Sequence, residues 1–250
     1  MQRLDHPSGN YQFCTGIAPY SAGVVAMSGY EIVRVTLQQS VPYRQGFDLI
    51  DRHLKDMGRP RQALCAVELR LPAARSFTGF INFNRDYRAI LAEWQILVGD
   101  ENPVARTNIA PAFAPPAEPA LYAFSYTVPN ATPRPTFIVA GAGDLNDQAN
   151  LTTEAVVRPG ETSAHALSEK AATVMGVMEA RLTGLGMTWD AVTAVDVYTV
   201  YPVRPLLVNG ILRKIGPAAA HGVTWFYSHP PIAALAFEMD VRGIRQELRL

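Results

Sequence analysis

The chain has 250 residues, of which 48% are hydrophobic and 18% charged, and its formal net charge is zero. This length suits one large domain or two domains of roughly 120 residues. The balanced charge argues against a nucleic-acid-binding face. The sequence has no apolar run of about 18 residues and its first ten residues are polar, so we expect no membrane span, no signal peptide and a cytoplasmic location.

Cysteine and histidine are sparse. The only cysteines are Cys14 and Cys65, and two thiols make neither a disulfide framework nor a zinc site. The five histidines are scattered, without the close pairing that is typical of zinc enzymes. We therefore expect no metal site and no cofactor.

The strongest internal signal is a repeat. Residues Gly58–Leu69 align without gaps on Gly186–Val197, and within them Ala66–Glu68 matches Ala194–Asp196 as Ala-Val-acid. Similar segments in the same local order favour a duplicated unit.

Each copy of the repeat sits between predicted elements of the same kind. Apolar residues recur at helical spacing from Phe47 to Met57, and Gly58 stands where that helix would end. The same spacing runs from Leu167 to Leu185, with Ser163 as the expected N-cap. The further predicted elements are strands at 65–71 and 195–199, helices at about 84–97 and 204–215, and closing strands at about 105–112, 120–128, 222–228 and 233–243.

Each half thus reads β-β-α-β-α-β-β. We predict an α/β (α+β) fold of two tandem domains, residues 1–130 and 136–250, each a mixed sheet with two helices on one face. The break falls at Pro129–Pro135, where three prolines exclude a helix interior or a central strand. The alternative is a long surface loop within one domain. A sheet covered on one face leaves the other face for a partner, so we expect oligomers.

Three motifs of the first half carry a family resemblance. They are Ala18–Val25 (Ala-Pro-Tyr-Ser), Asn84–Tyr87 (Asn-x-x-Tyr) and Pro103–Asn108 (Pro-Val-Ala-Arg). In the second half, Phe137–Gly143 and Leu235–Val241 have the character of an opening and a closing strand. In this order the segments resemble the RidA (YjgF-type) imine/enamine deaminase family, whose domains have a chorismate-mutase-like fold.

The resemblance implies roles for individual residues. Arg106 matches the arginine that holds the substrate carboxylate, and Asn108 stands where many members have cysteine. Glu238 matches the glutamate that orients water. Tyr20 and Asn84 belong to the matched motifs, and we expect Tyr20 to be catalytic and Asn84 to bind substrate.

Neither half carries a full set of these residues. The closing strand of the first half, Leu121–Tyr126, has no glutamate. In the second half the arginine segment reads Ala219–Val223, and His221 is the nearest candidate for a catalytic role. The two sets are complementary, so we expect one composite pocket that uses Arg106 and Glu238, within one chain or between chains.

The chemistry explains why these residue types matter. The planar guanidinium of arginine offers a carboxylate two parallel charge-assisted hydrogen bonds. Hydrolysis of a carbon–nitrogen double bond needs a positioned water and a proton carrier, and one carboxylate can supply both. Burial on a strand would raise the pKa of that acid and suit it to the task.

Each candidate also has a plain structural explanation. Arg106 could belong to a structural ion pair, Glu238 could face solvent with Asp240 as the competing acid on the same face, and Tyr20 could be a packed aromatic. Asn84 could be a helix N-cap and His221 an ordinary loop histidine.

The leading functional hypothesis is hydrolytic deamination of an imine or enamine of a small carboxylic acid, such as a 2-aminomuconate or a 2-imino acid, with release of ammonia. The alternatives are a chorismatase-like carboxylate enzyme and a non-catalytic ligand-binding or interaction module. The expected partner is a small carboxylate substrate, with no nucleic acid and no membrane. Members of the resembled family form trimers, and most oligomers have closed symmetry, so we expect a homotrimer with six domains.

Overall fold

A computed structural model describes residues 1–132 and 134–250, so Pro133 of the expected break lies outside the described residues. The strands join in one mixed sheet in the order β1-β2-β3-β8-β11-β9-β10-β6-β5-β7-β4-β12. The strands are β1 (Arg3–His6), β2 (Tyr11–Cys14), β3 (Gly23–Ala26), β4 (Tyr30–Pro42), β5 (Leu64–Arg70), β6 (Ala105–Pro111), β7 (Ala120–Pro129), β8 (Phe137–Gly143), β9 (Ala194–Thr199), β10 (Thr224–His229), β11 (Glu238–Gly243) and β12 (Gln246–Arg249).

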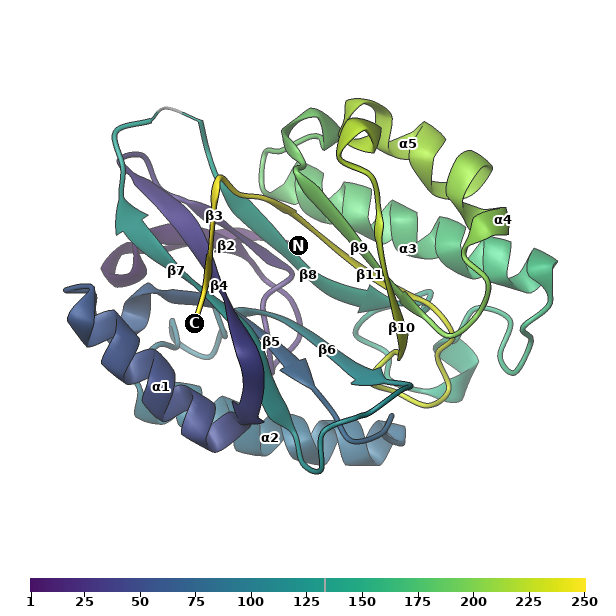
Figure 1. The fold of residues 1–250 in the computed structure, drawn as a ribbon, viewed down its shortest axis with the longest axis horizontal. Coiled ribbons are helices and arrows are strands. Elements are labelled where there is room, and N and C mark those ends of the chain that lie inside the picture. The colour runs from purple at the N-terminus through teal and green to yellow at the C-terminus, as the bar shows by residue number, and fades with distance from the viewer. Residues whose placement is uncertain (133) are drawn as a thin grey trace.

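The helices lie on the outside of the sheet (Figure 1). The two helices of the first half flank one part of it and those of the second half flank the other. They are α1 (Tyr43–Asp56), α2 (Phe77–Glu93), α3 (Ala164–Gly184), α4 (Arg204–Leu206) and α5 (Arg213–Ile215), with a π-helical turn (Leu207–Leu212) between the last two. The predicted mixed α+β fold is confirmed.

The N-terminal strands join the sheet of the second half. Strand β3 pairs antiparallel with β8, with Gly23 opposite Val139, and β2 and β1 extend the sheet beyond it. The expectation of two strands before the first helix of each half is wrong, because β8 alone precedes α3. Strand β3, which pairs with β2 on its other side, lies beside β8 where the second expected strand of the second half would lie.

The C-terminal strand makes the opposite crossing. Strand β12 pairs in parallel with β4 of the first half. Glu247 of β12 forms an ion pair with Arg34 of β4, with 3.0 Å between Glu247 Oε1 and Arg34 Nη1. Strand pairing therefore crosses the expected boundary in both directions. The division at residues 130–136 and the tandem duplication remain predictions.

Two predicted boundaries were wrong. Helix α2 begins at Phe77, not near Asn84, because the Ser76 hydroxyl caps it by accepting a hydrogen bond from Gly79 N at 3.1 Å. Strand β11 begins at Glu238, not near 233, because residues 230–237 form a loop. Ser163 caps α3 as expected.

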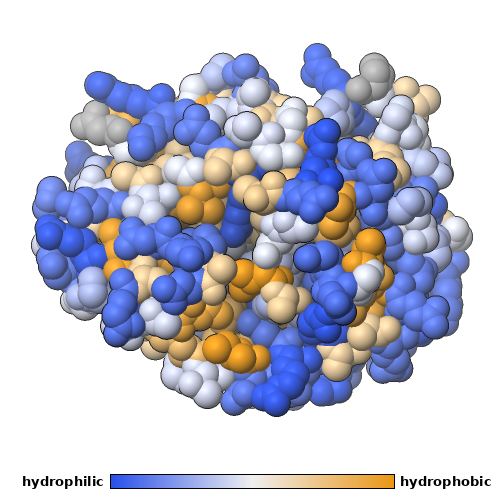
Figure 2. Space-filling view, turned by 180° about the vertical axis from the view of Figure 1, so that it is seen from behind, coloured by the Kyte–Doolittle hydropathy of each residue, from blue (hydrophilic) through white to orange (hydrophobic). Residues whose placement is uncertain are grey.

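Each half has its own apolar core. Phe47, Ile50 and Leu54 of α1 pack with α2 and the strands beneath it. A second core surrounds α3, and Cys14 of β2 and Ala22, just before β3, belong to it. The face in Figure 2 gathers apolar patches toward its middle and charged residues around its rim. Within the described residues, no helix combines the length and apolar character needed to cross a bilayer.

Candidate active site

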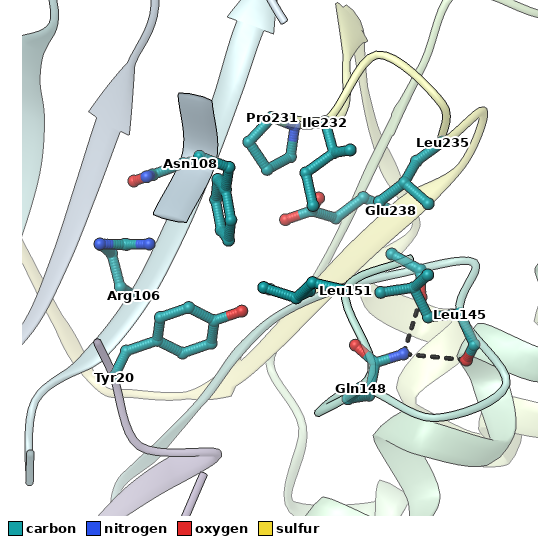
Figure 3. Close-up of a pocket in the computed structure, with 13 residues that line it drawn as sticks. Tyr20, Arg106, Asn108, Leu145, Gln148, Leu151, Pro231, Ile232, Leu235 and Glu238 are labelled. Carbon is teal, nitrogen blue, oxygen red and sulfur yellow. Dashed lines mark hydrogen bonds between the residues drawn. The ribbon is translucent and has the colours of Figure 1, made fainter. Parts of the chain in front are cut away.

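A partly open cavity lies where the two halves meet. Its walls come from the N-terminal segment, α2, β6, β8, β11 and the loops beside them (Figure 3). The lining residues are Tyr20, Phe80, Arg106, Asn108, Gly141, Gly143, Leu145, Gln148, Leu151, Pro231, Ile232, Leu235 and Glu238. Candidates from both halves of the sequence thus line one cavity within a single chain.

Helix α2 builds the surroundings of Arg106. Phe80, Asn84 and Tyr87 are spaced by four and three residues, which places them on one helix face. The Arg106 guanidinium carbon lies 4.6 Å from the centre of the Tyr87 ring and 5.7 Å from that of Phe80. Arg106 Nη2 donates a hydrogen bond to Asn84 Oδ1 at 2.6 Å. Asn84 therefore lies inside the helix and is not its N-cap.

Arg106 carries a buried charge. Its side chain is 3% exposed, and among the described residues no carboxylate lies within ion-pair distance of it. Nη1 is buried and makes no hydrogen bond to the part of the chain that the structure describes. Burial lowers the pKa of Arg106, but a guanidinium keeps its proton in proteins. The alternative of a structural ion pair finds no support, and the arrangement suits a small anion.

Backbone contacts bring Tyr20 to the same arginine. Ser21 N donates to Val104 O at 3.0 Å, and Asn102 Nδ2 donates to Pro19 O at 2.6 Å. These bonds fix residues 19–21 beside the start of β6, so the Tyr20 ring lies 4.8 Å from the Arg106 guanidinium carbon. Burial raises the pKa of the Tyr20 hydroxyl. Figure 3 shows this hydroxyl pointing into the cavity, so it can act as a neutral donor.

Asn108 supplies an unsatisfied amide. It follows Arg106 by two residues on β6, so both side chains leave the same face of the strand. The residue is 3% exposed, and neither Oδ1 nor Nδ2 has a hydrogen-bond partner among residues 1–132 and 134–250. A buried amide without partners is unfavourable, so a polar ligand in the cavity would stabilise it.

Glu238 opens strand β11 and reaches into the cavity from the second half (Figure 3). Its side chain is buried over Gly141 of β8, and a Cβ at position 141 would collide with Glu238 Oε1. Gly141 and Gly143 both line the cavity. These glycines therefore make room for the acid and for a ligand beside it.

A buried ion pair fixes the chain just before Glu238. Asp144 Oδ1 accepts hydrogen bonds from Ala236 N at 2.9 Å and Phe237 N at 3.0 Å. Asp144 Oδ2 accepts from Lys170 Nζ at 2.7 Å, and both of these side chains are almost fully buried. The loop after β8, helix α3 and the start of β11 are thus tied together at the point where Glu238 enters the site.

Burial raises the pKa of Glu238 well above the ordinary value of 4.5. The negative charge of Asp240 acts in the same direction, while Arg181 and Arg106 oppose it. The acid therefore keeps its proton to a higher pH than an exposed glutamate does. A carboxyl that is protonated near neutral pH can first donate a proton and then accept one.

Two other candidates do not line this cavity. Asp240 is buried, accepts a hydrogen bond from Tyr198 at 2.9 Å and lies 3.8 Å from Arg242. His221 is exposed at the end of a short 3-10 helix, Gly216–His221, and is not among the residues that line the cavity. Among the described residues, no cluster of histidine, cysteine or acidic side chains has an arrangement that would hold a metal ion.

The apolar and amide part of the cavity wall was not predicted from the sequence. Leu145, Gln148 and Leu151 come from the loop after β8, and Ile232 and Leu235 from the loop before β11. These loop positions carry no periodic signal. Gly141 and Gly143 did carry a signal in the sequence. Two glycines on one face of a strand indicate that a ligand or another chain segment approaches the backbone closely.

Known proteins resemble the chain along nearly its whole length. A family model described as 2-aminomuconate deaminase CnbZ matches residues 3–248. A 2-amino-5-chloromuconate deaminase of Comamonas testosteroni is 38% identical over 241 residues, 96% of this chain and 95% of that protein. A chorismatase crystal structure aligns at 12% identity with a TM-score of 0.46, covering 89% of this chain and 77% of that one. The chain belongs to the 2-aminomuconate deaminase CnbZ family.

Proposed function

We propose that this protein hydrolyses the carbon–nitrogen bond of a 2-aminomuconate-type enamine, through its imine tautomer, and releases ammonia. The observation that carries the proposal is that one cavity is lined by a buried guanidinium, which contacts no carboxylate of the described residues, and by a buried carboxyl whose pKa is raised. The first can hold the carboxylate next to the amino-bearing carbon. The second can move the protons that the reaction needs.

Arg106 anchors the substrate carboxylate. Asn84 holds Nη2, and Nη1 is left for the ligand. The rings of Tyr20 and Tyr87 lie within 5 Å of the guanidinium carbon and stabilise its charge where water is excluded. Because this cation is already desolvated and oriented, it can bind a carboxylate with little rearrangement.

Glu238 carries the protons. Its carboxyl first protonates the enamine at carbon, which gives the iminium ion and leaves Glu238 ionised. The carboxylate then takes a proton from water as the water oxygen bonds to the iminium carbon, which gives the neutral carbinolamine. Glu238 passes this proton to the nitrogen, the carbon–nitrogen bond breaks, ammonia leaves, and the hydroxyl returns its proton to Glu238 as the 2-oxo acid forms. Overall, enamine plus water gives 2-oxo acid plus ammonia, and Glu238 ends protonated as it began.

Tyr20 and Asn108 orient the reacting groups. The neutral Tyr20 hydroxyl can donate to the water or to the carbinolamine oxygen. The Asn108 amide offers both an acceptor for the substrate amino group and a donor for its carboxylate. Both residues lie on the same side of the cavity as Arg106 (Figure 3).

The test is ammonia release from freshly prepared 2-aminomuconate, measured together with formation of the 2-oxo acid. The wild-type protein is expected to form both in equal amounts. Glu238→Gln keeps the size of the side chain but loses the proton carrier, and should lower kcat by about 10²–10⁴-fold. The proposal fails if the wild type releases no ammonia above the spontaneous rate. Turnover of chorismate instead would assign the site to a different carboxylate reaction.

A further inference from the structure

A second buried arginine lies behind the same site. Arg181 belongs to α3 and is 5% exposed. Its Nη1 donates to Ala140 O at 2.8 Å and to Gly141 O at 3.1 Å, which places it against the strand that lies under Glu238. Among the described residues no carboxylate lies within ion-pair distance of Arg181. A guanidinium has donors on three nitrogens, and these two bonds use only one of them.

Arg181 lines a cavity of its own. This cavity, of about 770 Å³, is bounded by the N-terminal segment, the loop after β8 and α3. Tyr20 and Gln148 line both this cavity and the one that holds Arg106. The two cavities therefore share a wall made by two side chains. Asp147 is the acid that lines the second cavity, and its Oδ1 accepts a hydrogen bond from Ala149 N at 2.9 Å.

Both arginines act on the same central groups. The positive charges of Arg181 and Arg106 lower the pKa of Glu238 against the effect of burial, and they act in the same way on Tyr20. Glu238 and Tyr20 are therefore close enough to both guanidinium groups to feel their charge. One cation approaches from β6 of the first half and the other from α3 of the second half.

We propose that Arg181 is a second carboxylate anchor, which makes the site specific for an extended dicarboxylate. One carboxylate binds Arg106, the other reaches Arg181 past Tyr20 and Gln148, and the carbon that bears nitrogen lies beside Glu238. The inference rests on the proposed function and adds a determinant of substrate class. A monocarboxylate of the same carbon skeleton would leave the Arg181 charge without a counter-ion.

The test compares two ligands that differ by one carboxylate. trans,trans-Muconate and sorbate share the conjugated six-carbon chain, and neither has an amino group to lose. Calorimetry on the wild-type protein is expected to show muconate binding about 10–100-fold more tightly than sorbate, the range for a hydrogen-bonded charged group. Arg181→Gln should remove most of that preference by weakening muconate, with sorbate almost unchanged. The matched control, Arg204→Gln, replaces an exposed arginine of α4 and should keep the preference.

Arg181→Lys separates carboxylate binding from the structural role of Arg181, which donates hydrogen bonds to the backbone of β8. It keeps the charge and can still reach a backbone carbonyl, so it should retain part of the preference for muconate. Equal affinity of the wild type for the two ligands overturns the second anchor, whether or not the Arg181 variants fold. An unchanged preference in a folded Arg181→Gln protein overturns it as well. If the wild type still releases ammonia from 2-aminomuconate in either case, the proposed function stands and only the second anchor is lost.

Discussion

Gly141 leaves the space that Glu238 occupies, since a Cβ at position 141 would overlap the Glu238 carboxylate. The two residues lie on neighbouring strands, β8 and β11, in the second half of the chain. The position of the proton carrier thus depends on the absence of a side chain from the strand beside it.

Gly141→Ala is expected to displace Glu238 and lower kcat for ammonia release by about tenfold or more, because a misplaced acid loses proton-transfer efficiency. Steady-state kinetics and thermal unfolding measure the effect. Gly176→Ala is the matched control, because a Cβ there meets nothing within 4 Å on the exposed side of α3. It should leave activity unchanged and raise stability by about 0.5–1 kcal/mol. Equal activity of both variants would show that Glu238 is not fixed by Gly141.

Glu238 also predicts a pH dependence of stability. Its folded pKa is raised above the unfolded value of 4.5 by burial, so the folded state holds the proton more tightly. Its contribution is fully present below the unfolded pKa and is lost as the pH rises through the folded pKa. At high pH, each tenfold difference in proton affinity between the folded and unfolded states lowers the free energy of unfolding by about 1.4 kcal/mol.

Glu238→Gln removes this cost because its amide cannot ionise. The Tm of the variant relative to wild type should therefore rise with pH above about 4.5, by roughly 2–4 °C for each kcal/mol. Calorimetric unfolding between pH 4 and pH 9 measures this difference. A difference in Tm that is constant with pH would contradict a raised pKa for Glu238.

Asn84 orients Arg106 without neutralising it, and Asn84→Asp tests this. The substitution keeps the hydrogen bond but places a negative charge on the guanidinium, where it competes with the substrate carboxylate. KM should rise by about 10–100-fold, with a smaller change in kcat. Asn82→Asp is the control, because Asn82 accepts a hydrogen bond from exposed Arg85 on the same helix. If both variants keep the wild-type KM, Arg106 does not bind the substrate carboxylate.

The expected homotrimer can be tested independently of catalysis. Trp225 and Tyr227 of β10 are 48% and 55% exposed, and their rings are in contact at 6.2 Å between centroids. Exposed aromatic side chains on a strand suit a contact between subunits. Light scattering at micromolar concentration should give three times the chain mass, and a Trp225→Glu variant should give less. A stable wild-type monomer would refute the assembly.

Helix ends were predicted correctly where a single residue determines the backbone conformation or supplies the cap. Gly58 follows the end of α1 with a φ of +65°, and Ser163 caps α3, because each meets a local backbone requirement. The start of α2 was missed because the Ser76 cap is followed by Phe-Thr-Gly, which is a weak helical signal. The pairing of β3 with β8 could not be predicted, because local periodicity does not encode strand partners.

The family motifs predicted which candidate residues lie together, while their roles remain predictions. Arg106, Tyr20, Asn108 and Glu238 line one cavity as the complementary half-sets suggested, with Asn84 bound to Arg106. The loop residues had no pattern to reveal them. Arg181 had a weak signal, since it is a charged residue beside the apolar stripe of α3 with no acid three or four residues away.

We propose that Arg106 of the first half and Glu238 of the second half act on one substrate molecule within one chain. The direct measurement is ammonia release by protein purified after co-expression of Arg106→Ala and Glu238→Gln chains, so that mixed oligomers form. We predict no more activity than the sum of the two variants assayed separately, because no chain in the mixture has both residues. Substantial recovery of activity would show that the two residues meet between chains and would contradict the single-chain site.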